Sequence, residues 1–225
     1  MPKKQTGFTL IEIAIVLVII GLLLGGILKG QELINSAKVK NLATDFKNIP
    51  VFIYGYQDKF RALPGDDAGV AAHVAGTPAT TPAGLQPNGV IDGSWNSTSK
   101  TDESFLFWQH VRLAGLAPGS TDINAADYLP TNAAGGTIGI QSGTSTAASS
   151  PIIDSSSAAI RGSYVICSTG ILGQFVKQLD TQMDNDDTAT GSMLATPTTE
   201  YKIGNKATEK KDIDEAATYV VCMGV

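Results

Sequence analysis

The sequence predicts an α+β fold in which one long amino-terminal helix packs on a small antiparallel β-sheet. Residues 13–28 are uncharged and almost entirely apolar. Beyond them, apolar residues recur every three or four positions as far as Phe60, which is the spacing of one helical face. Two near-copies of one sequence, YVIC at residues 164–167 and YVVC at residues 219–222, lie far apart in the chain. Their β-branched and aromatic side chains favour strands.

The first part of the chain has the composition of a membrane-spanning helix. Together with residues 8–11, the apolar run covers about 20 residues, which as a helix crosses a bilayer core of about 30 Å. Lys3 and Lys4 precede the run, and positive charge tends to stay in the cytoplasm, so the rest of the chain is predicted to lie outside. A secretory signal peptide fits less well, because the small residue Gly7 precedes the apolar core and no small-residue cleavage site follows it.

One acidic residue, Glu12, interrupts the start of the apolar run. An ionised carboxylate in hydrocarbon costs several kcal/mol unless it is paired. One explanation is a capping box with Thr9, three residues earlier, which would satisfy backbone N–H groups at the helix start. The other explanation is a cation, because a cut after Gly7 would give Phe8 a new ammonium group, in the same subunit or in a neighbouring one. A plain membrane anchor gives Glu12 no role.

The sequence GFTLIE at residues 7–12, followed by an apolar helix, resembles the prepilin signature of type IV pilins and type II secretion pseudopilins. The resemblance implies a pilin-like fold, cleavage between Gly7 and Phe8 by a prepilin peptidase, and N-methylation of Phe8. It also implies that Glu12 pairs with the Phe8 amine of a neighbouring subunit during filament assembly. The strict motif covers only the beginning of the chain, about residues 1–30.

The amino-terminal helix is predicted to continue to residue 61. Its second half carries a heptad-like apolar stripe of Val39, Leu42, Phe46, Ile49, Ile53, Tyr56 and Phe60. This half is therefore amphipathic, and the stripe is expected to pack against the rest of the domain. Pro50 removes one backbone donor and is expected to bend the helix. Lys29 stands where many pilins carry a proline. The locally unfolded helix segment that the family shows in its filaments is therefore not expected from the resemblance for this chain.

The remaining residues are predicted to form one globular domain with long loops. LPGDD at residues 63–67 ends the long helix. The elements predicted after it are helices over residues 102–114 and 171–183 and strands over residues 138–140, 161–168 and 218–225. Residues 117–160 contain low-complexity sequence, and apart from the short strand they are expected to be loosely packed.

Two cysteines, Cys167 and Cys222, lie in the two near-copy strands. In an oxidising compartment beyond the membrane, one disulfide is the economical interpretation, and two buried thiols are the alternative. The resemblance favours the disulfide, because pilins commonly cross-link their carboxy-terminal region with a disulfide. Two cysteines without a matching histidine cluster make a poor zinc site.

One acidic stretch, DNDD at residues 184–187, has the oxygen-rich composition that calcium prefers. A calcium loop of the EF-hand type that started at Asp184 would need glycine and glutamate where the chain has Ala189 and Ala195. Some pseudopilins bind calcium in a carboxy-terminal loop, so calcium and a solvated acidic turn both remain open. No metal ligand is predicted.

Charge and motifs argue against two further function classes. The net charge is −5, whereas a broad nucleic-acid surface needs a basic face. The chain has no nucleophile elbow, phosphate loop or zinc signature. Its two histidines, His73 and His110, stand outside any motif, and His110 is expected to be packed rather than to bind a ligand. We therefore expect no catalytic residue, no cofactor and no enzymatic activity.

The resemblance implies a filament subunit with four parts. These are a leader (residues 1–7), a membrane and filament-core half-helix (8–30), an amphipathic half-helix (31–61) and a carboxy-terminal domain (62–225). The implied partners are a prepilin peptidase, further copies or sibling pilins, the inner membrane and an assembly platform. The domain is expected in the periplasm before assembly and in an extracellular or periplasmic filament afterwards. A pseudopilin is the main alternative, and a membrane-anchored binding module is a third.

Overall fold

The computed structural model describes residues 9–199 and 201–225. Its helices are α1 (Leu10–Phe60), α2 (Val70–Val74), α3 (Glu103–Leu113) and α4 (Gly173–Met183), with short 3₁₀ turns at Ala147–Ser149 and Lys210–Asp212. Its strands are β1 (Ile138–Ser142), β2 (Ile152–Ile153), β3 (Tyr164–Leu172), β4 (Met193–Pro197), β5 (Asn205–Lys206) and β6 (Thr218–Gly224). The chain divides between Lys38 and Val39 into two compact units.

In the first unit, α1 is apolar on every side between Glu12 and Lys29. Its most apolar 18-residue window has a mean hydropathy of 2.9, and none of that window is buried. By length and composition this helix can cross a membrane, and it is the one such helix in the described part of the chain. Exposed apolar surface is unfavourable in water by about 25 cal/mol per Å². This segment therefore requires lipid or other apolar helices around it.

From Val39 onward, α1 buries one face and exposes the other. The predicted stripe is confirmed from Val39 to Tyr56, because Val39, Leu42, Phe46, Ile49, Ile53 and Tyr56 are each at most 2% exposed, whereas its last predicted member, Phe60, is only half-buried. On the opposite face, Val51 and Tyr54 are 64% and 58% exposed. Pro50 lies inside the helix without ending it. The helix ends at Phe60, one residue before the predicted end, and Arg61 takes a positive φ of 55°.

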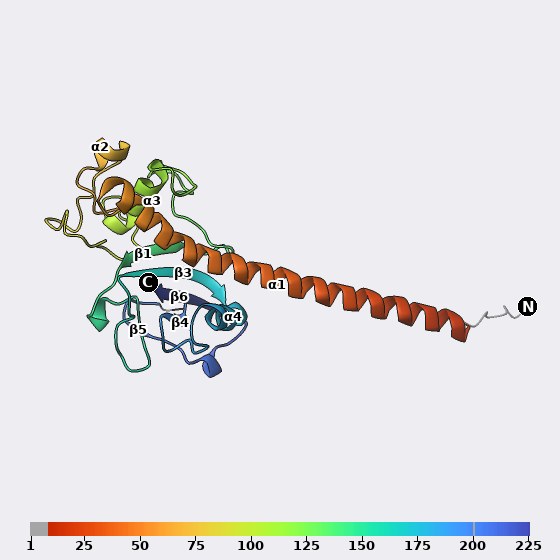
Figure 1. Cartoon of the computed structure of the whole chain (residues 1–225). Helices are drawn as coiled ribbons and strands as arrows, with labels where there is room; N and C mark the ends of the chain where they lie inside the picture. Colours follow the sequence, from red (N-terminus) through yellow and green to blue (C-terminus); the bar gives the residue numbers. More distant parts are fainter. Residues whose placement is uncertain (1–8, 200) are drawn as a thin grey trace, which may run out of the picture. The chain divides into compact units, whose positions relative to one another are not determined.

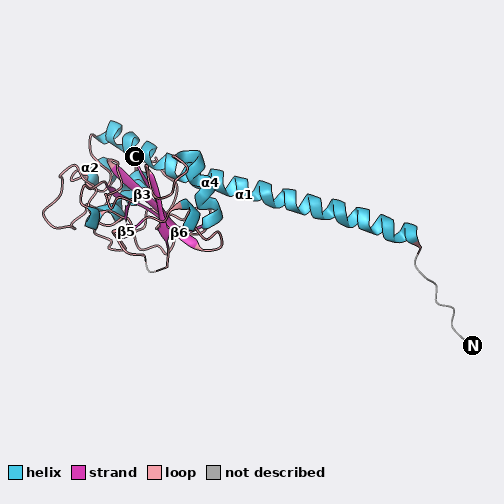
Figure 2. Ribbon diagram, turned by 90° about the horizontal axis from the view of Figure 1, so that it is seen from below, coloured by secondary structure: helices cyan, strands magenta, loops and turns pink. Residues whose placement is uncertain are grey.

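The main sheet has four strands in the order β1-β3-β6-β4, and each neighbouring pair is antiparallel. Figures 1 and 2 show these strands gathered into one layer, with α4 beside β3 and β6. A separate parallel pair joins β2 and β5. The prediction of an α+β, pilin-like fold is confirmed: a long apolar amino-terminal helix, whose part from Val39 onward packs on a small antiparallel sheet.

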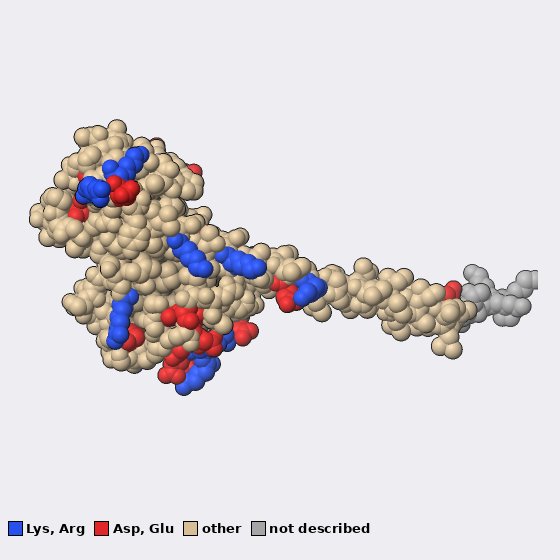
Figure 3. Space-filling model, viewed as in Figure 1, with Lys and Arg blue, Asp and Glu red and all other residues tan. Residues whose placement is uncertain are grey.

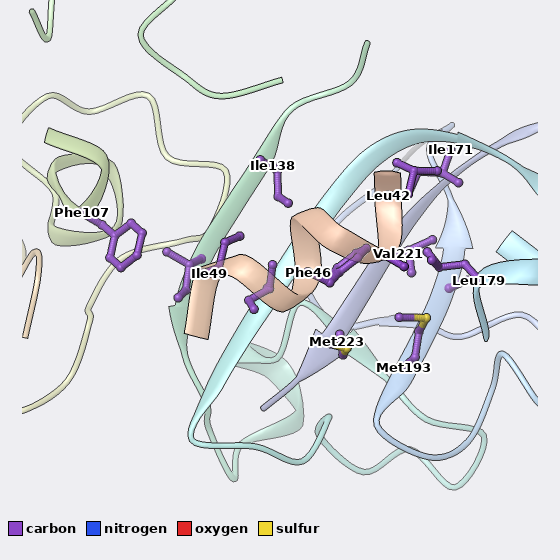
Figure 4. Packing of buried hydrophobic residues seen from close by; sticks show 14 of the residues in the cluster. Leu42, Phe46, Ile49, Phe107, Ile138, Ile171, Leu179, Met193, Val221 and Met223 are labelled. Atoms are coloured by element: carbon purple, nitrogen blue, oxygen red, sulfur yellow. The ribbon is translucent and has the colours of Figure 1, made fainter. Parts of the chain in front are cut away.

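The sheet separates two apolar clusters, because successive residues of a strand point to opposite faces. On β6, Tyr219, Val221 and Met223 belong to the cluster that contains the α1 stripe. Figure 4 shows Phe46 of α1 directed toward Val221 and Met223 in this cluster. Between them on the same strand, Val220 and Cys222 belong to the second cluster, on the other face.

The predicted disulfide lies within the sheet. Cys167 of β3 and Cys222 of β6 are directly paired across the antiparallel strands, and a disulfide joins them. Both side chains are fully buried in the second cluster. The near-copy sequences around the two cysteines are therefore neighbouring central strands, each with alternate residues on each face.

The domain contains a strand and a packed region that the sequence did not predict. Strand β4 was not predicted, although Met193 pairs with Met223 and Pro197 pairs with Tyr219 along β6. Residues 117–160 were expected to be loosely packed, yet Ile152 and Ile160 are at most 2% exposed and help to form the second cluster. Single apolar residues separated by serine and alanine show no period, so sequence pattern alone does not identify them as core.

Strand β3 is longer than predicted. The predicted strand ended at Ser168, but β3 continues to Leu172 across a register shift between Ser168 and Ile171. Gly170 lies in this interval with a φ of 72°, a conformation that glycine adopts readily. The extra residue spacing of a β-bulge lets the strand bend and continue. Helix α4 consequently begins at Gly173 instead of residue 171.

Candidate functional site

The start of α1 forms the capping box that the spacing of Thr9 and Glu12 predicted. The backbone N–H and the hydroxyl of Thr9 both donate to Oε2 of Glu12, at 2.8 Å and 2.7 Å. In return, the backbone N–H of Glu12 lies 3.4 Å from the Thr9 hydroxyl. This reciprocal arrangement fixes the carboxylate at the amino-terminal end of the helix. Gly7 and Phe8, the predicted cleavage and methylation residues, lie outside the described residues.

The capping box engages one oxygen of the Glu12 carboxylate and leaves the other accessible. All the Thr9 contacts to the carboxylate go to Oε2, and no described residue donates a hydrogen bond to Oε1. A carboxylate can accept hydrogen bonds at both oxygens. The capping explanation and the cation explanation for Glu12 are therefore compatible, because the cap orients the carboxylate and a second group can bind Oε1.

Between Glu12 and Lys29 the helix carries no charged side chain. Figure 3 shows this part of α1 as an uninterrupted uncharged surface with charged residues at its two ends. At its far end, Lys29 pairs with Glu32 at 2.7 Å, and both side chains are exposed. An exposed pair of this kind contributes little to stability. The Lys29–Glu32 pair marks the end of the uncharged run, after which α1 carries polar and charged side chains.

Four glycines lie on the exposed part of α1, and none is required by a contact with another described residue. A Cβ atom added at Gly21, Gly25, Gly26 or Gly30 would meet nothing within 4 Å. Glycine disfavours a helix by about 1 kcal/mol relative to alanine. In membrane helices, small residues allow neighbouring helices to approach closely. These positions give α1 several places where another helix can contact its backbone.

A buried polar network holds the end of α1 in the domain. The Asp67 carboxylate accepts a hydrogen bond from the Tyr56 hydroxyl at 2.6 Å and from the backbone N–H of Gly69 at 2.8 Å. It also contacts Nδ1 of His73 at 2.7 Å. Asp67 is 3% exposed, and these hydrogen bonds lower the pKa of its carboxyl despite the opposing effect of burial. The acidic turn after the helix is therefore a structural anchor.

His110 is packed, as its sequence context predicted. It is fully buried on α3, where its Nδ1 accepts a hydrogen bond from the backbone N–H of Gly65 at 2.9 Å. Its Nε2 lies 2.9 Å from the carbonyl oxygen of Thr77, and it donates there when the ring is neutral. Burial lowers the pKa of the imidazole. Both ring nitrogens are engaged, so His110 presents no atom to a ligand.

Glu103 is an ionisable group that the sequence did not single out. Its side chain is fully buried, with Oε2 accepting a hydrogen bond from the backbone N–H of Asp92 at 2.7 Å. Its Oε1 has no partner among the described residues. Burial, with a smaller effect from Asp66 and Asp92, raises the pKa of this carboxyl to about 7. The sequence indicated only an acid in the first turn of a helix.

The Glu103→Gln variant is expected to be more stable than the wild type at pH 8, by about 1–3 kcal/mol. The folded pKa of about 7 lies above the ordinary value of 4.5. The stabilising contribution of the Glu103 proton is therefore fully present below about pH 4.5 and is lost as the pH rises through 7. Urea unfolding at pH 5 and pH 8 measures the difference.

The matched control for this experiment is Glu215→Gln, because the Glu215 side chain is 67% exposed. It is expected to change the free energy of unfolding by less than about 0.5 kcal/mol at either pH. If Glu103→Gln altered stability equally at pH 5 and pH 8, Glu103 would not be the group that titrates near neutrality.

The acidic stretch at residues 184–187 is tied into the domain by hydrogen bonds. The Asp184 carboxylate accepts from the backbone N–H groups of Ser192 and Met193, at 2.7 Å and 2.8 Å. Asp186 pairs with Lys210. Over residues 9–199 and 201–225, no group of three or more His, Cys, Asp or Glu side chains has a geometry suited to a metal ion.

Comparison with known proteins assigns a motif to the beginning of the chain. Residues 2–28 match the prokaryotic N-terminal methylation motif. No curated protein and no solved structure matched the chain. The match confirms the signature predicted from residues 7–12, and together with the apolar helix it fits anchoring in a membrane.

Proposed function

We propose that this chain, which carries a type IV pilin-like prepilin signature at residues 2–28, is a major or minor structural subunit of a type IV pilus-like filament. The motif supports a pilin or pseudopilin, and it implies processing by a prepilin peptidase and assembly with other pilins. The observation that carries the proposal is the capped acid Glu12 at the head of an otherwise uncharged, unburied helix.

The subunit begins as a membrane-anchored precursor. Its apolar helix spans the inner membrane once, with the basic leader in the cytoplasm and the carboxy-terminal domain in the periplasm, as the positive-inside tendency predicts. The peptidase cuts between Gly7 and Phe8, and the new amino group of Phe8 is methylated. Cleavage places a cationic amine close to the carboxylate of Glu12.

Assembly exchanges lipid contacts of α1 for contacts with the helices of other subunits. The unburied apolar surface up to Lys38 supplies cohesion through burial and close packing. The accessible Oε1 of Glu12 accepts the Phe8 amine of a neighbouring subunit, which sets the axial position of one helix against the next. The protein thus acts by polymerisation, and the proposed role requires neither catalysis nor a cofactor.

A pseudopilin of a type II secretion system is the second candidate, because the matched motif is common to both classes. A membrane-anchored binding module is less consistent with the sequence, because a monomeric anchor has no use for an acid within its apolar helix. The two filament classes differ in their assembly platform, so the platform that incorporates the purified subunit distinguishes them.

The processing step is tested by producing the full chain with and without an active prepilin peptidase. Intact mass and amino-terminal sequencing are expected to show loss of residues 1–7 and one added methyl group on Phe8. A Gly7→Val variant is expected to stay uncut, whereas Gly21→Val, within the apolar helix and with nothing within 4 Å of an added Cβ atom, is expected to be cut normally. Cleavage after the apolar run would instead indicate a secretory signal peptide.

A further inference from the structure

A cavity of about 690 Å³ lies beside α3. Its walls come from α3, from residues 98–100 and from the loop of residues 118–131. The wall includes the apolar or aromatic side chains of Phe105, Ile123, Tyr128 and Leu129. Cavities of about 300–1,000 Å³ with mostly apolar walls and a few polar groups are typical small-molecule sites. Nothing in the proposed filament function uses this cavity.

Arg112 gives the cavity a buried positive charge. The residue is 7% exposed, and its guanidinium lies 5.7 Å from the centre of the Trp108 ring and 5.2 Å from that of Tyr128. Its Nε donates to the carbonyl oxygen of Pro118 at 3.0 Å. Its Nη1 donates to the carbonyl oxygens of Ser120 and Tyr128, at 2.8 Å and 2.6 Å.

These partners of Arg112 are all neutral. No described carboxylate lies within ion-pair distance of the guanidinium. Burial lowers the pKa of this group, but an arginine side chain keeps its charge in proteins. A buried charge without a counter-charge is unfavourable. The acid that acts electrostatically on it is Asp127, an exposed residue of the cavity wall.

One amino group of Arg112 remains available to a ligand. No described residue accepts a hydrogen bond from Nη2, whereas Nε and Nη1 are fully engaged. A Cβ atom at Gly119 would lie 2.7–2.8 Å from Nε, Cζ and Nη2. Any larger residue at position 119 would therefore crowd the guanidinium. Lys100, also in the cavity wall, contacts Oδ1 of Asn124 at 2.7 Å and adds a second cation.

We propose that this cavity binds a small organic monocarboxylate. The carboxylate accepts a hydrogen bond from Nη2 of Arg112, and the apolar body of the ligand packs against Phe105, Ile123 and Leu129. The free Nη2 group of the buried Arg112 matches one carboxylate oxygen, and Lys100 supplies a further cation in the same wall. The mainly apolar wall favours an acid with a hydrocarbon or aromatic body.

The test uses 3-phenylpropionate as the probe and its neutral analogue 3-phenylpropanol as the control. Full-length protein in detergent micelles is labelled with ¹⁵N, and the indole signals of its two tryptophans are followed by NMR. Trp108 stacks near Arg112, whereas Trp95 donates its indole N–H to Tyr201 in the second cluster. The acid is expected to shift the Trp108 signal saturably and to leave Trp95 unchanged. Simple partition of the probe into the micelles would not shift the Trp108 signal while leaving the Trp95 signal unchanged.

Three variants test the charge requirement without removing Arg112, which also holds the loop. Ala126→Glu places an acid at an exposed position of the cavity wall and is expected to weaken binding about tenfold relative to Ala126→Gln. Asp127→Asn removes the nearby acid and is expected to tighten binding about threefold.

Two results would overturn the proposal. If the alcohol shifted Trp108 with the same affinity as the acid, the cavity would recognise only the apolar body. If neither compound shifted Trp108 or the amides of residues 123–129, Arg112 would serve only to tie the loop to α3.

Discussion

Glu12→Ala is expected to leave the chain produced and cleaved but to lower its incorporation into filaments of the wild-type subunit by at least about tenfold. The variant subunit leaves the Phe8 amine of a neighbouring chain without a counter-charge among apolar helices, which costs several kcal/mol. Co-production of tagged variant and wild-type chains, followed by shearing and immunoblotting of filaments, measures the incorporation.

The capping box makes two matched controls available for this prediction. Glu12→Gln keeps the capping-box pattern, because glutamine also serves at this position, but it removes the charge, and it is expected to assemble as poorly as Glu12→Ala. Thr9→Ala removes the cap, at about 0.5–2 kcal/mol, but keeps the charge, and it is expected to assemble. If Glu12→Gln assembled normally and Thr9→Ala did not, capping would be the whole role of Glu12.

Phe46→Ala is expected to lower the free energy of unfolding of the domain by about 3–5 kcal/mol. Phe46 is 0% exposed and lies at the centre of the cluster that joins α1 to the sheet (Figure 4). Replacing it removes apolar burial and leaves a cavity that the surrounding side chains fill only in part. Urea unfolding of the full chain in detergent, followed by tryptophan fluorescence, measures the loss.

Tyr54→Ala provides the comparison on the same helix. Tyr54 is 58% exposed, so its removal is expected to change stability by less than about 0.5 kcal/mol. The pair therefore separates burial from helix propensity, because each variant replaces an aromatic residue of α1 with alanine. Equal losses in the two variants would show that the stripe does not pack α1 on the domain.

The sequence predicted the elements with a long or distinctive pattern. The stripe from Val39 to Tyr56 repeats over several turns, so its period identifies both the helix and its buried face. The near-copy sequences around Cys167 and Cys222 identify the central strands by their β-branched and aromatic residues. The spacing of Thr9 and Glu12 identifies the cap, because both partners lie within one helical turn.

The features that the sequence did not predict depend on partners far away in the chain. Strand β4 is recognisable only from its pairing with β6. The raised pKa of Glu103 arises from burial and from Asp66 and Asp92, and the environment of Arg112 arises from a loop that folds back over α3. No local spacing encodes such contacts, because they exist only after the chain is folded.

The alternation of side chains along β6 makes the two faces of the sheet energetically separable. One face is committed to α1, while the other carries the disulfide and isolated apolar residues such as Ile152 and Ile160. Substitutions at well-separated sites without shared partners add in their effect on stability. Changes in the loops over the disulfide face are therefore expected to add to the effects of substitutions in the layer that packs with α1, without altering them. The domain can vary what it displays while it keeps the helix attachment on which the proposed polymerisation depends.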